Sequence, residues 1–453
     1  MELVFTIGVG VAVAAMFMGR YARGAAHPAA PSEDALRAIC DRLTEVLAGT
    51  GRNGHVSPYT FGPGQPQTQT DGESGLRFTV LGLCPSVTLW RPAYARPRVI
   101  SDAAAEPVGE PEFDALLRAA GPVGDRLALL GADTRAAIRD LLRGSVRVGQ
   151  LWLEGGTLVV DVPTSGFAQR HPGLDQGARL IARLAAAVVA PNDVPARLSR
   201  NVACDPAPGV RWLSLRTLLE DHAAHHETRE AIGAALTDAD ESLRLEAALA
   251  AKSHGRETLI ALAIAPTTSG GCAARAIEAL GPDLPLHRME SLVRESAKPP
   301  HLGSRPAAIH AFIAALARAP GDAAMACLRD LLFDAHEPSY GPDVVDAIAR
   351  GSRPGAEAAL LPAVQMRGVA RPRTVEAAVI RLGAVGTAGS VLPLREAASH
   401  YGGSIARAAK LSIAAIQERI AGTPGRLALT DSDAGPLAEV PDASGRVTLP
   451  DEG

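Results

Sequence analysis

The sequence predicts three parts: a single N-terminal transmembrane helix, an α+β N-terminal domain, and an all-α solenoid of helix pairs. An uncharged apolar run lies near the N-terminus, at residues 3–19. Helix-like and strand-like patterns alternate from residue 32 to about residue 195. After residue 205 the strand-like patterns stop and helical periodicity recurs, which is typical of an all-helical segment.

The composition indicates a globular protein with few aromatic residues. Of the 453 residues, 47% are hydrophobic and 4% aromatic, and the net charge is −4. This length predicts more than one domain, and the negative charge argues against a dedicated nucleic-acid-binding protein, which usually carries a basic surface. The five cysteines are scattered and form no C-x-x-C motif. They are therefore interpreted as small core residues in a reducing compartment.

The apolar run "LVFTIGVGVAVAAMFMG" predicts a membrane anchor over residues 2–20. Arg20 and Arg23 follow the run, and no basic residue precedes it. The positive-inside tendency therefore predicts a single-pass protein of the inner (cytoplasmic) membrane, with the bulk of the chain in the cytoplasm. The alternative is a secretory signal cleaved near Ala25 or Ala26, which the missing basic residues before the run disfavour.

Residues 32–195 predict the α+β domain. Ser32 is a suitable N-cap for an amphipathic helix that ends at Gly49. Two further helices are predicted, one capped by Asp133 and one over residues 175–189.

The same domain contains predicted strands. Residues 76–83 and 86–90 have the composition of strands, and residues 148–163 predict a hairpin that turns at Gly155-Gly156. Residues 50–75 are rich in Gly, Pro, Thr and Gln, so they predict a mobile loop. Helices and strands in one segment of this size predict an α+β unit.

The acidic segment "VGEPEFDALLRAAG" begins at Val108. Glu112 and Asp114 are two residues apart, so they would diverge on a helix, and no nucleophile or histidine is near them in sequence. We therefore interpret the segment as a turn that Phe113 and Leu116 anchor to the core. It resembles a stretch of uncharacterised bacterial membrane proteins in which a mixed domain precedes helical repeats, and this resemblance implies an architecture without an activity.

The C-terminal half contains an internal repeat. "DPAPGVRWLSLRTLL" begins at Asp205 and "DADESLRLEAALAA" at Asp238. Both have an Asp, five residues, an Arg and then an apolar helix, 33 positions apart. Two later helices end at Gly281 and Gly383, and 383 − 281 = 102 is three times 34. Helix pairs at such a period predict an α-solenoid.

In these segments the chain resembles HEAT-like repeat proteins of the phycobilisome-lyase type. The resemblance covers residues 205–420 and implies about six or seven helix pairs. It also implies a ladder between neighbouring repeats, formed by the turn aspartates and the arginines that follow them: Asp205, Arg211, Asp238 and Arg244. Shared repeats imply a fold and not a reaction, so the lyase activity is not carried over.

The segment "LLEDHAAHHETRE" contains three histidines. His222 and His226 would share a face of a continuous helix, as zinc ligands do. The repeat pattern instead predicts one helix over residues 210–223 and another from about Thr228, with His225 in the turn between them. We therefore predict no metal site there.

Residues 421–453 contain six acidic residues, two arginines and many Pro, Gly and Ser, so they predict a disordered acidic tail. The chain contains no G-x-S-x-G, Walker A or H-E-x-x-H motif. The sequence thus predicts no catalytic residue, no cofactor and no metal ligand.

These features predict a membrane-anchored, non-enzymatic scaffold that binds another protein through its repeat surface. The alternative is a solenoid enzyme, or a protein that binds nucleic acid or a tetrapyrrole, as HEAT-like repeats sometimes do. The net charge argues against nucleic acid, and the few aromatic residues argue against stacking a base or a flat cofactor.

Overall fold

The computed structural model describes the chain in ranges separated by gaps: residues 33–49, 53–60, 74–91, 105–143, 148–163, 172–296, 305–319, 321–334, 340–350, 355–365, 371–421, 427–428 and 438–439. The chain divides into two compact units, residues 1–231 and 232–453. The predicted anchor lies outside the described ranges. None of the helices within these ranges is long and apolar enough to span a bilayer.

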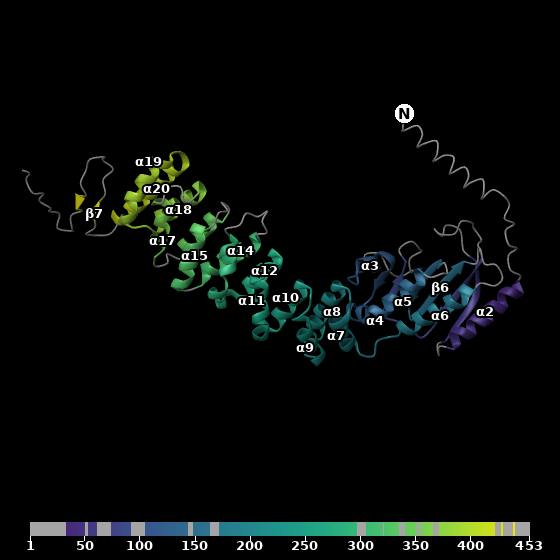
Figure 1. The fold of residues 1–453 in the computed structure, drawn as a ribbon. Coiled ribbons are helices and arrows are strands. Elements are labelled where there is room, and N and C mark those ends of the chain that lie inside the picture. Colours follow the sequence, from purple (N-terminus) through teal and green to yellow (C-terminus); the bar gives the residue numbers. More distant parts are fainter. Residues whose placement is uncertain are drawn as a thin grey trace, which may run out of the picture. The chain divides into compact units, whose positions relative to one another are not determined.

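The first unit contains a six-stranded antiparallel sheet (Figure 1). The strand order is β1-β2-β6-β5-β3-β4. The strands are β1 (Gly54–Thr60), β2 (Ser74–Val80), β3 (Thr88–Trp90), β4 (Arg118–Ala120), β5 (Gln150–Glu154) and β6 (Thr157–Pro163). The predicted hairpin is confirmed, because β5 and β6 pair around Gly155 and Gly156, whose positive φ angles of 54° and 76° suit glycine.

The prediction of a loop over residues 50–75 is wrong for residues 54–60. These residues form β1, which pairs with the whole of β2 at the edge of the sheet. Gly, Ser and Pro make this segment a poor strand by local propensity, so the hydrogen bonds of β2 must supply the order that the residues lack. Pro58 is tolerated because an edge strand needs only one side of its backbone for the sheet.

In the described part of the first unit, seven helices accompany the sheet. They are α2 (Glu33–Ala48), α3 (Pro111–Leu116), α4 (Val123–Leu129), α5 (Ala132–Arg143), α6 (Pro172–Ala187), α7 (Val194–Cys204) and α8 (Pro208–Asp221). α2 packs on β1 and α6, and α6 packs on α5. One face of the sheet is apolar: Leu76, Phe78 and Val160 are at most 1% exposed. α7 and α8 pack on each other and on α4, so they belong to the same compact unit as the sheet.

A further helix, α9 (His226–Ala235), spans the division, and the second unit then consists of helices in chain order. They are α10 (Glu241–Ala250), α11 (Arg256–Ile264), α12 (Gly270–Leu280), α13 (Glu290–Ser296), α14 (Pro306–Arg318), α15 (Asp322–Asp334), α16 (Gly341–Ala349), α17 (Ala356–Gln365), α18 (Pro372–Val385), α19 (Val391–Tyr401) and α20 (Gly403–Ala421). Two short strands, β7 (Leu427–Ala428) and β8 (Ala438–Glu439), pair within the predicted acidic tail.

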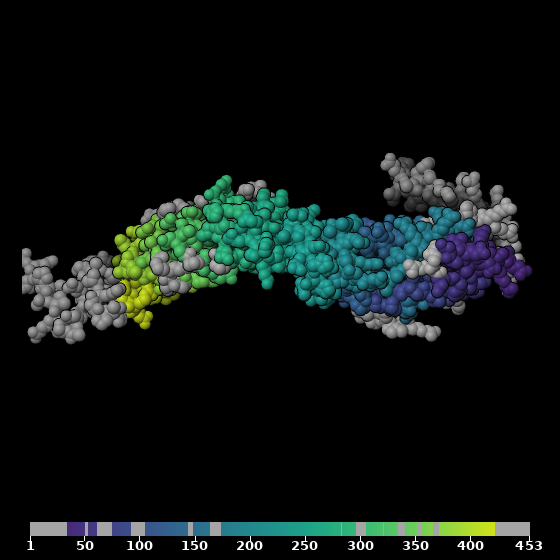
Figure 2. Space-filling model, turned by 90° about the horizontal axis from the view of Figure 1, so that it is seen from below, coloured from purple at the N-terminus to yellow at the C-terminus, as the bar shows by residue number. Residues whose placement is uncertain are grey.

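The helices of the second unit lie in two rows. α10, α12, α14, α16, α18 and α20 pack successively on one another, and α13, α15, α17 and α19 form the second row. In Figure 2 the colours of this unit follow one another from teal to yellow, so that successive segments of the chain lie next to one another. Helices of the first row begin 29 to 36 residues apart, as in 270 − 241 = 29 and 306 − 270 = 36. The structure is therefore mostly helical with a small sheet, which is compatible with an α+β domain and helical repeats.

Small residues let the helices of the second unit approach one another closely. In α14 the residues Ala308, Ala311 and Ala315 are all at most 7% exposed. A Cβ added to Gly383 of α18 would lie 2.7 Å from Oγ of Ser412 in α20. That serine hydroxyl donates a hydrogen bond of 2.9 Å to the carbonyl oxygen of Val379. The alanine-rich faces of the sequence thus become contacts between consecutive pairs.

Candidate functional site

The two predicted Asp–Arg pairs form the same local turn in the structure. Oδ1 of Asp205 accepts from the N–H of Ala207 at 3.0 Å, and Oδ1 of Asp238 accepts from that of Asp240 at 2.7 Å. Arg211 donates to the carbonyl oxygen of Asp205 at 2.8 Å, and Arg244 donates to that of Asp238 at 2.6 Å. The same two hydrogen bonds therefore occur in both turns, 33 residues apart. These contacts lie within each turn, and a ladder between neighbouring repeats through these four residues stays a prediction.

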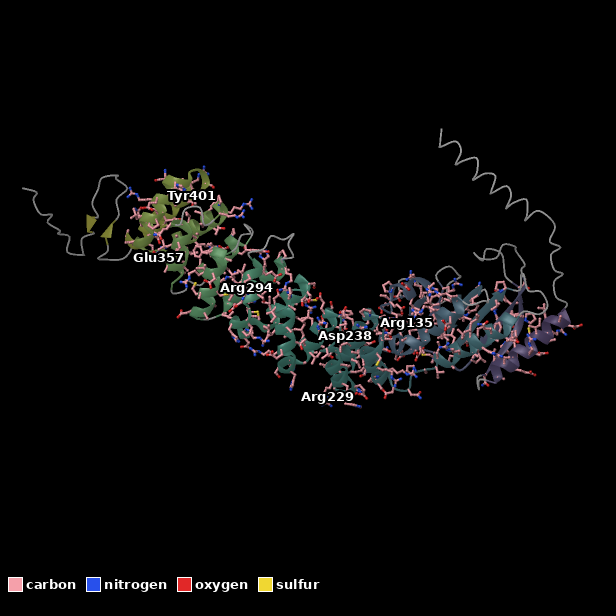
Figure 3. All side chains as sticks on the ribbon, viewed as in Figure 1. Arg135, Arg229, Asp238, Arg294, Glu357 and Tyr401 are labelled. Atoms are coloured by element: carbon pink, nitrogen blue, oxygen red, sulfur yellow. The ribbon has the colours of Figure 1, made fainter. Side chains whose placement is uncertain are left out.

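We expect Arg244→Ala to destabilise the second unit by about 1 kcal/mol, because a charged donor leaves two turn carbonyls, those of Asp238 and Ala239. The matched control is Arg294→Ala, which removes an exposed ion pair with Glu290 and should cost less than about 0.5 kcal/mol (Figure 3). Thermal unfolding followed by circular dichroism at the helical signal measures both. Equal melting temperatures for the two variants would show that the turn does not depend on Arg244.

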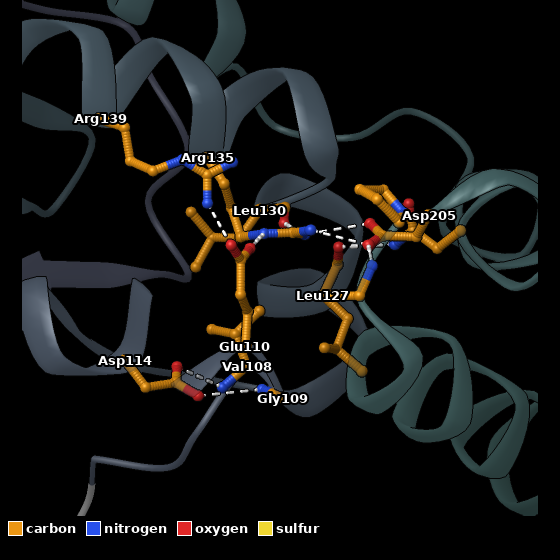
Figure 4. Close-up of polar contacts among 12 residues, drawn as sticks. Val108, Gly109, Glu110, Asp114, Leu127, Leu130, Arg135, Arg139 and Asp205 are labelled. Atoms are coloured by element: carbon orange, nitrogen blue, oxygen red, sulfur yellow. Dashed lines mark hydrogen bonds and ion pairs between the residues drawn. The ribbon is translucent and has the colours of Figure 1, made fainter. Parts of the chain in front are cut away.

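The carboxylate of Asp205 forms a buried ion pair with an arginine of the α+β domain (Figure 4). The Nη2 and Nη1 atoms of Arg135 donate to it at 2.7 and 3.0 Å, and both side chains are 0% exposed. Arg135 also donates to the carbonyl oxygen of Leu130 at 2.7 Å and to Glu110, which binds Arg139 as well. Burial lowers the pKa of Arg135, but its bonds to Asp205 and Glu110 outweigh burial and raise it. Arg135 is therefore a charged residue at the centre of this network.

The acidic segment before α3 has structural contacts. Burial raises the pKa of Glu110, but hydrogen bonds and charges of Arg135 and Arg139 outweigh it, so the net shift is downward. The carboxylate of Asp114 accepts from the N–H groups of Val108 and Gly109, at 2.8 and 3.1 Å. The segment thus forms a capped turn followed by the short helix α3.

The core anchors of this segment are partly as predicted. Phe113 is 0% exposed, as expected. The second anchor is Leu117, at 2% exposed, and not Leu116, which is half-buried. The reason is that α3 ends at Leu116 and the chain continues into the strand β4, so that Leu117 is the residue that faces the core.

A close backbone contact lies beside this network. Gly109 has a φ of 98°, and a Cβ built on Gly209, at the start of α8, would meet the backbone carbonyl of Gly109. Only two glycines permit this approach. The contact and the Asp205–Arg135 pair together hold α7 and α8 on the α+β domain.

Polar contacts also join consecutive helix pairs at residues that were not predicted. Along the first row, Arg275 pairs with Glu246 at 2.9 Å and Arg381 with Asp346 at 2.6 Å, at sequence separations of 29 and 35. His310 and Asp343 are 3.0 Å apart. These separations match the repeat length, so the contacts recur along the row.

Glu357, on α17, joins consecutive pairs in the second row (Figure 3). Its Oε1 accepts from the hydroxyl groups of Ser390 and Thr387 at 2.6 and 2.9 Å and from the N–H of Thr387 at 2.9 Å. Burial raises the pKa of Glu357, but these hydrogen bonds outweigh it and lower the pKa below its ordinary value of 4.5. The carboxylate form therefore stabilises the contact with the start of α19.

A carboxyl group whose pKa is lowered on folding stabilises the protein above its unfolded pKa, and that stabilisation is lost as the pH falls through the folded pKa. We therefore expect Glu357→Gln to be less stable than the unmodified chain at pH 7. The difference should shrink as the pH falls below 4.5. Urea unfolding at several pH values, followed by circular dichroism, measures it. A difference that stays constant down to pH 3 would mean that this carboxylate does not contribute.

His225 lies in a turn between two helices, as predicted, whereas His222 follows the end of the first helix and His226 begins the second. α8 ends at Asp221 and α9 begins at His226, and the rings of His222 and His225 make an edge-to-face contact with centroids 5.3 Å apart. His226 lies 3.1 Å from Glu227. Within the described ranges no group of three or more His, Cys, Asp or Glu residues could hold a metal ion. The absence of metal in this turn stays a prediction.

Exposed apolar side chains gather at the end of the second unit. Among the residues that the structure describes, the large apolar side chains with strong exposure are Leu81, Ile380, Leu392 and Leu411, at 47%, 53%, 64% and 68%. The last three belong to α18, α19 and α20.

Ile380 and Leu411 each lie eight residues after the first residue of their helix, since 380 − 372 = 8 and 411 − 403 = 8. Because α18 and α20 pack side by side in one row, these two side chains occupy equivalent positions. We call Ile380 and Leu411 the apolar pair.

Exposed basic residues lie beside Leu411 of the apolar pair. Residues 371–421 contain seven basic and three acidic residues, so 7 − 3 gives a net charge of +4, against −4 for the whole chain. Arg407 and Lys410 are exposed within one turn of Leu411. This surface was not predicted from the sequence, although an apolar residue on the polar side of two consecutive repeat helices is a signal that indicates it.

No protein family and no curated protein matches the chain. Among solved structures, that of human deoxyhypusine hydroxylase in complex with glycerol is similar at 16% sequence identity. The match covers 49% of this chain and 96% of that one, with a TM-score of 0.23. A likeness at this score carries no argument about fold or function.

Proposed function

We propose that this chain is a non-enzymatic scaffold that binds another protein through its HEAT-like helical repeats, held at the inner membrane by residues 2–20. The observation that carries the proposal is the apolar pair, Ile380 and Leu411, at equivalent positions of α18 and α20. Single exposed apolar residues are normal on protein surfaces, whereas grouped ones mark interaction sites. In a repeat protein, equivalent positions of consecutive helices form a continuous strip that suits an extended partner.

The partner that fits this strip is an acidic amphipathic segment of another protein. Its apolar residues would cover Ile380 and Leu411, and its carboxylates would lie beside Arg407 and Lys410. Complementary charge favours encounter and orientation, while the apolar contacts supply affinity. The net charge of +4 over residues 371–421 also supports an acidic partner over a basic one.

Photo-crosslinking in cells tests the proposal. A photoreactive amino acid is placed at position 411 of the full chain, and at position 229 as the control, because Arg229 is exposed on α9 (Figure 3). We expect one crosslinked protein from position 411 and none from position 229. The same proteins captured from both positions, or no crosslink from position 411, would contradict a binding strip on α18 and α20.

A further inference from the structure

A surface pocket of about 330 Å³ lies in the first unit, between the start of α5 and one side of α7. α5 contributes Asp133 and Thr134 to its lining, and α7 contributes Arg197, Arg200 and Asn201. The pocket is separate from the apolar pair and requires no part of the second unit.

The start of α5 presents unpaired backbone donors to this pocket. In a helix the N–H groups of the first turn have no intrahelical acceptor, and the helix dipole adds positive potential there. Such a helix end binds anions readily. α5 has 12 residues and begins at Ala132, so its first turn includes Asp133 and Thr134.

Thr134 gives independent evidence for a ligand. Its side chain lines the pocket although the residue is only 6% exposed. Within the described part of the chain, its hydroxyl makes no hydrogen bond. Its oxygen is not among the buried polar atoms that lack a partner, so the hydroxyl is reachable from the pocket and can donate a hydrogen bond to a ligand there.

The charges around the pocket favour an anion. Arg197 and Arg200 form no ion pair with any carboxylate in the described ranges. Asp205 also borders the pocket, but Arg135 neutralises it. Asp133 is exposed and opposes the arginines, so two positive charges and one negative charge face the pocket.

Asn201 adds a hydrogen-bond acceptor. The residue is 8% exposed, and its Nδ2 donates to the carbonyl oxygen of Leu127 at 3.0 Å. That bond leaves its amide oxygen as an acceptor on the pocket wall. Gly131 keeps this wall open, because a Cβ there would lie 3.3 Å from Oδ1 of Asn201. The ligand should therefore carry a hydroxyl donor next to its anionic group.

We propose that this pocket binds the phosphate group of a small hydroxylated phosphate ester. The phosphate oxygens accept hydrogen bonds from the first-turn N–H groups of α5 and from the hydroxyl of Thr134. Arg197 and Arg200 supply the compensating charge. A hydroxyl of the ester donates to Asn201. The same headgroup chemistry occurs in free sugar phosphates and in acidic phospholipids.

Isothermal titration of the full-length chain with inorganic phosphate and with glycerol 3-phosphate tests the site. We expect one saturable site for each probe, with tighter binding of glycerol 3-phosphate. Arg197→Gln and Arg200→Gln should each weaken binding by about tenfold, since each removes a charge-assisted hydrogen bond. Asp133→Asn should strengthen it, because a repelling charge disappears. Arg229→Gln, on the exposed surface of α9, is the control and should leave binding unchanged.

A second arm distinguishes the source of the phosphate group. Vesicles that contain phosphatidylglycerol, whose headgroup carries hydroxyls beside its phosphate, are compared with vesicles of phosphatidylcholine alone, for the unmodified chain and for Arg200→Gln. Sedimentation that needs both phosphatidylglycerol and Arg200 assigns the site to a lipid headgroup. Saturable binding of glycerol 3-phosphate without such sedimentation assigns it to a free ester. The proposal is overturned if neither soluble probe binds saturably and vesicle binding does not depend on Arg200. It is also overturned if all variants bind with equal affinity.

Discussion

Replacing Arg135 by alanine is expected to lower the free energy of unfolding of the first unit by about 3–5 kcal/mol. The substitution leaves the carboxylate of Asp205, which is 0% exposed, without its partner, and it removes the hydrogen bond to Glu110. An unpaired buried charge is among the most costly defects in a folded protein. The effect should appear in urea unfolding of the full chain, monitored by tryptophan fluorescence. All three tryptophans (Trp90, Trp152 and Trp212) lie in the first unit, so their signal reports on that unit.

Arg139→Ala is the matched control. Arg139 binds the same carboxylate, that of Glu110, but its side chain is 22% exposed and water can replace it. Its loss should therefore cost about 1 kcal/mol or less. If the two variants lose the same small amount of free energy, then the Asp205–Arg135 pair is solvated and does not connect α7 and α8 to the α+β domain.

Gly209→Ala is expected to destabilise the first unit by about 1–3 kcal/mol, the usual cost of overpacking. Helix propensity alone predicts the opposite sign, because alanine in a helix is favoured over glycine by about 1 kcal/mol. The added methyl group, however, would meet the backbone carbonyl of Gly109, and backbone atoms cannot move aside as a side chain can. The start of α8 must therefore separate from the loop before α3.

Gly233→Ala separates packing from propensity. Gly233 lies inside α9, and a Cβ added there would meet no atom within 4 Å. The same substitution should therefore stabilise the chain by up to about 1 kcal/mol. Circular dichroism during urea unfolding measures Gly233→Ala, and tryptophan fluorescence measures Gly209→Ala. A stabilising Gly209→Ala would show that the two glycines are not in contact.

Local periodicity predicted most of the helices and the hairpin because these elements depend on residues close in sequence. The strand β1 was missed because its order comes from β2 and not from its own residues. α7 was missed as well: residues 194–204 follow a Pro-Asn-Asp segment that resembles a linker, although Asp193 in fact caps the helix by accepting from the N–H of Ala196 at 3.0 Å.

The polar networks were harder to predict than the elements. Asp205 was identified from its repeat position, but its partner Arg135 is 70 residues away in another part of the fold. One signal was present, since Arg135 lies three residues before the buried Ile138 and so shares the apolar side of α5. The arginines and hydroxyl of the pocket on α5 and α7 come from two helices whose proximity no sequence spacing reveals.

The measurement that tests the scaffold function most directly uses the crosslinked partner and the double substitution Ile380→Glu with Leu411→Glu. Both side chains are more than half exposed, so the melting temperature should stay unchanged. The partner's affinity should fall at least about tenfold, because two apolar contacts are lost and an acidic segment would meet two added negative charges. The control Arg229→Glu should bind as the unmodified chain does. Equal affinities of the double variant and the unmodified chain would contradict a protein-binding strip on α18 and α20.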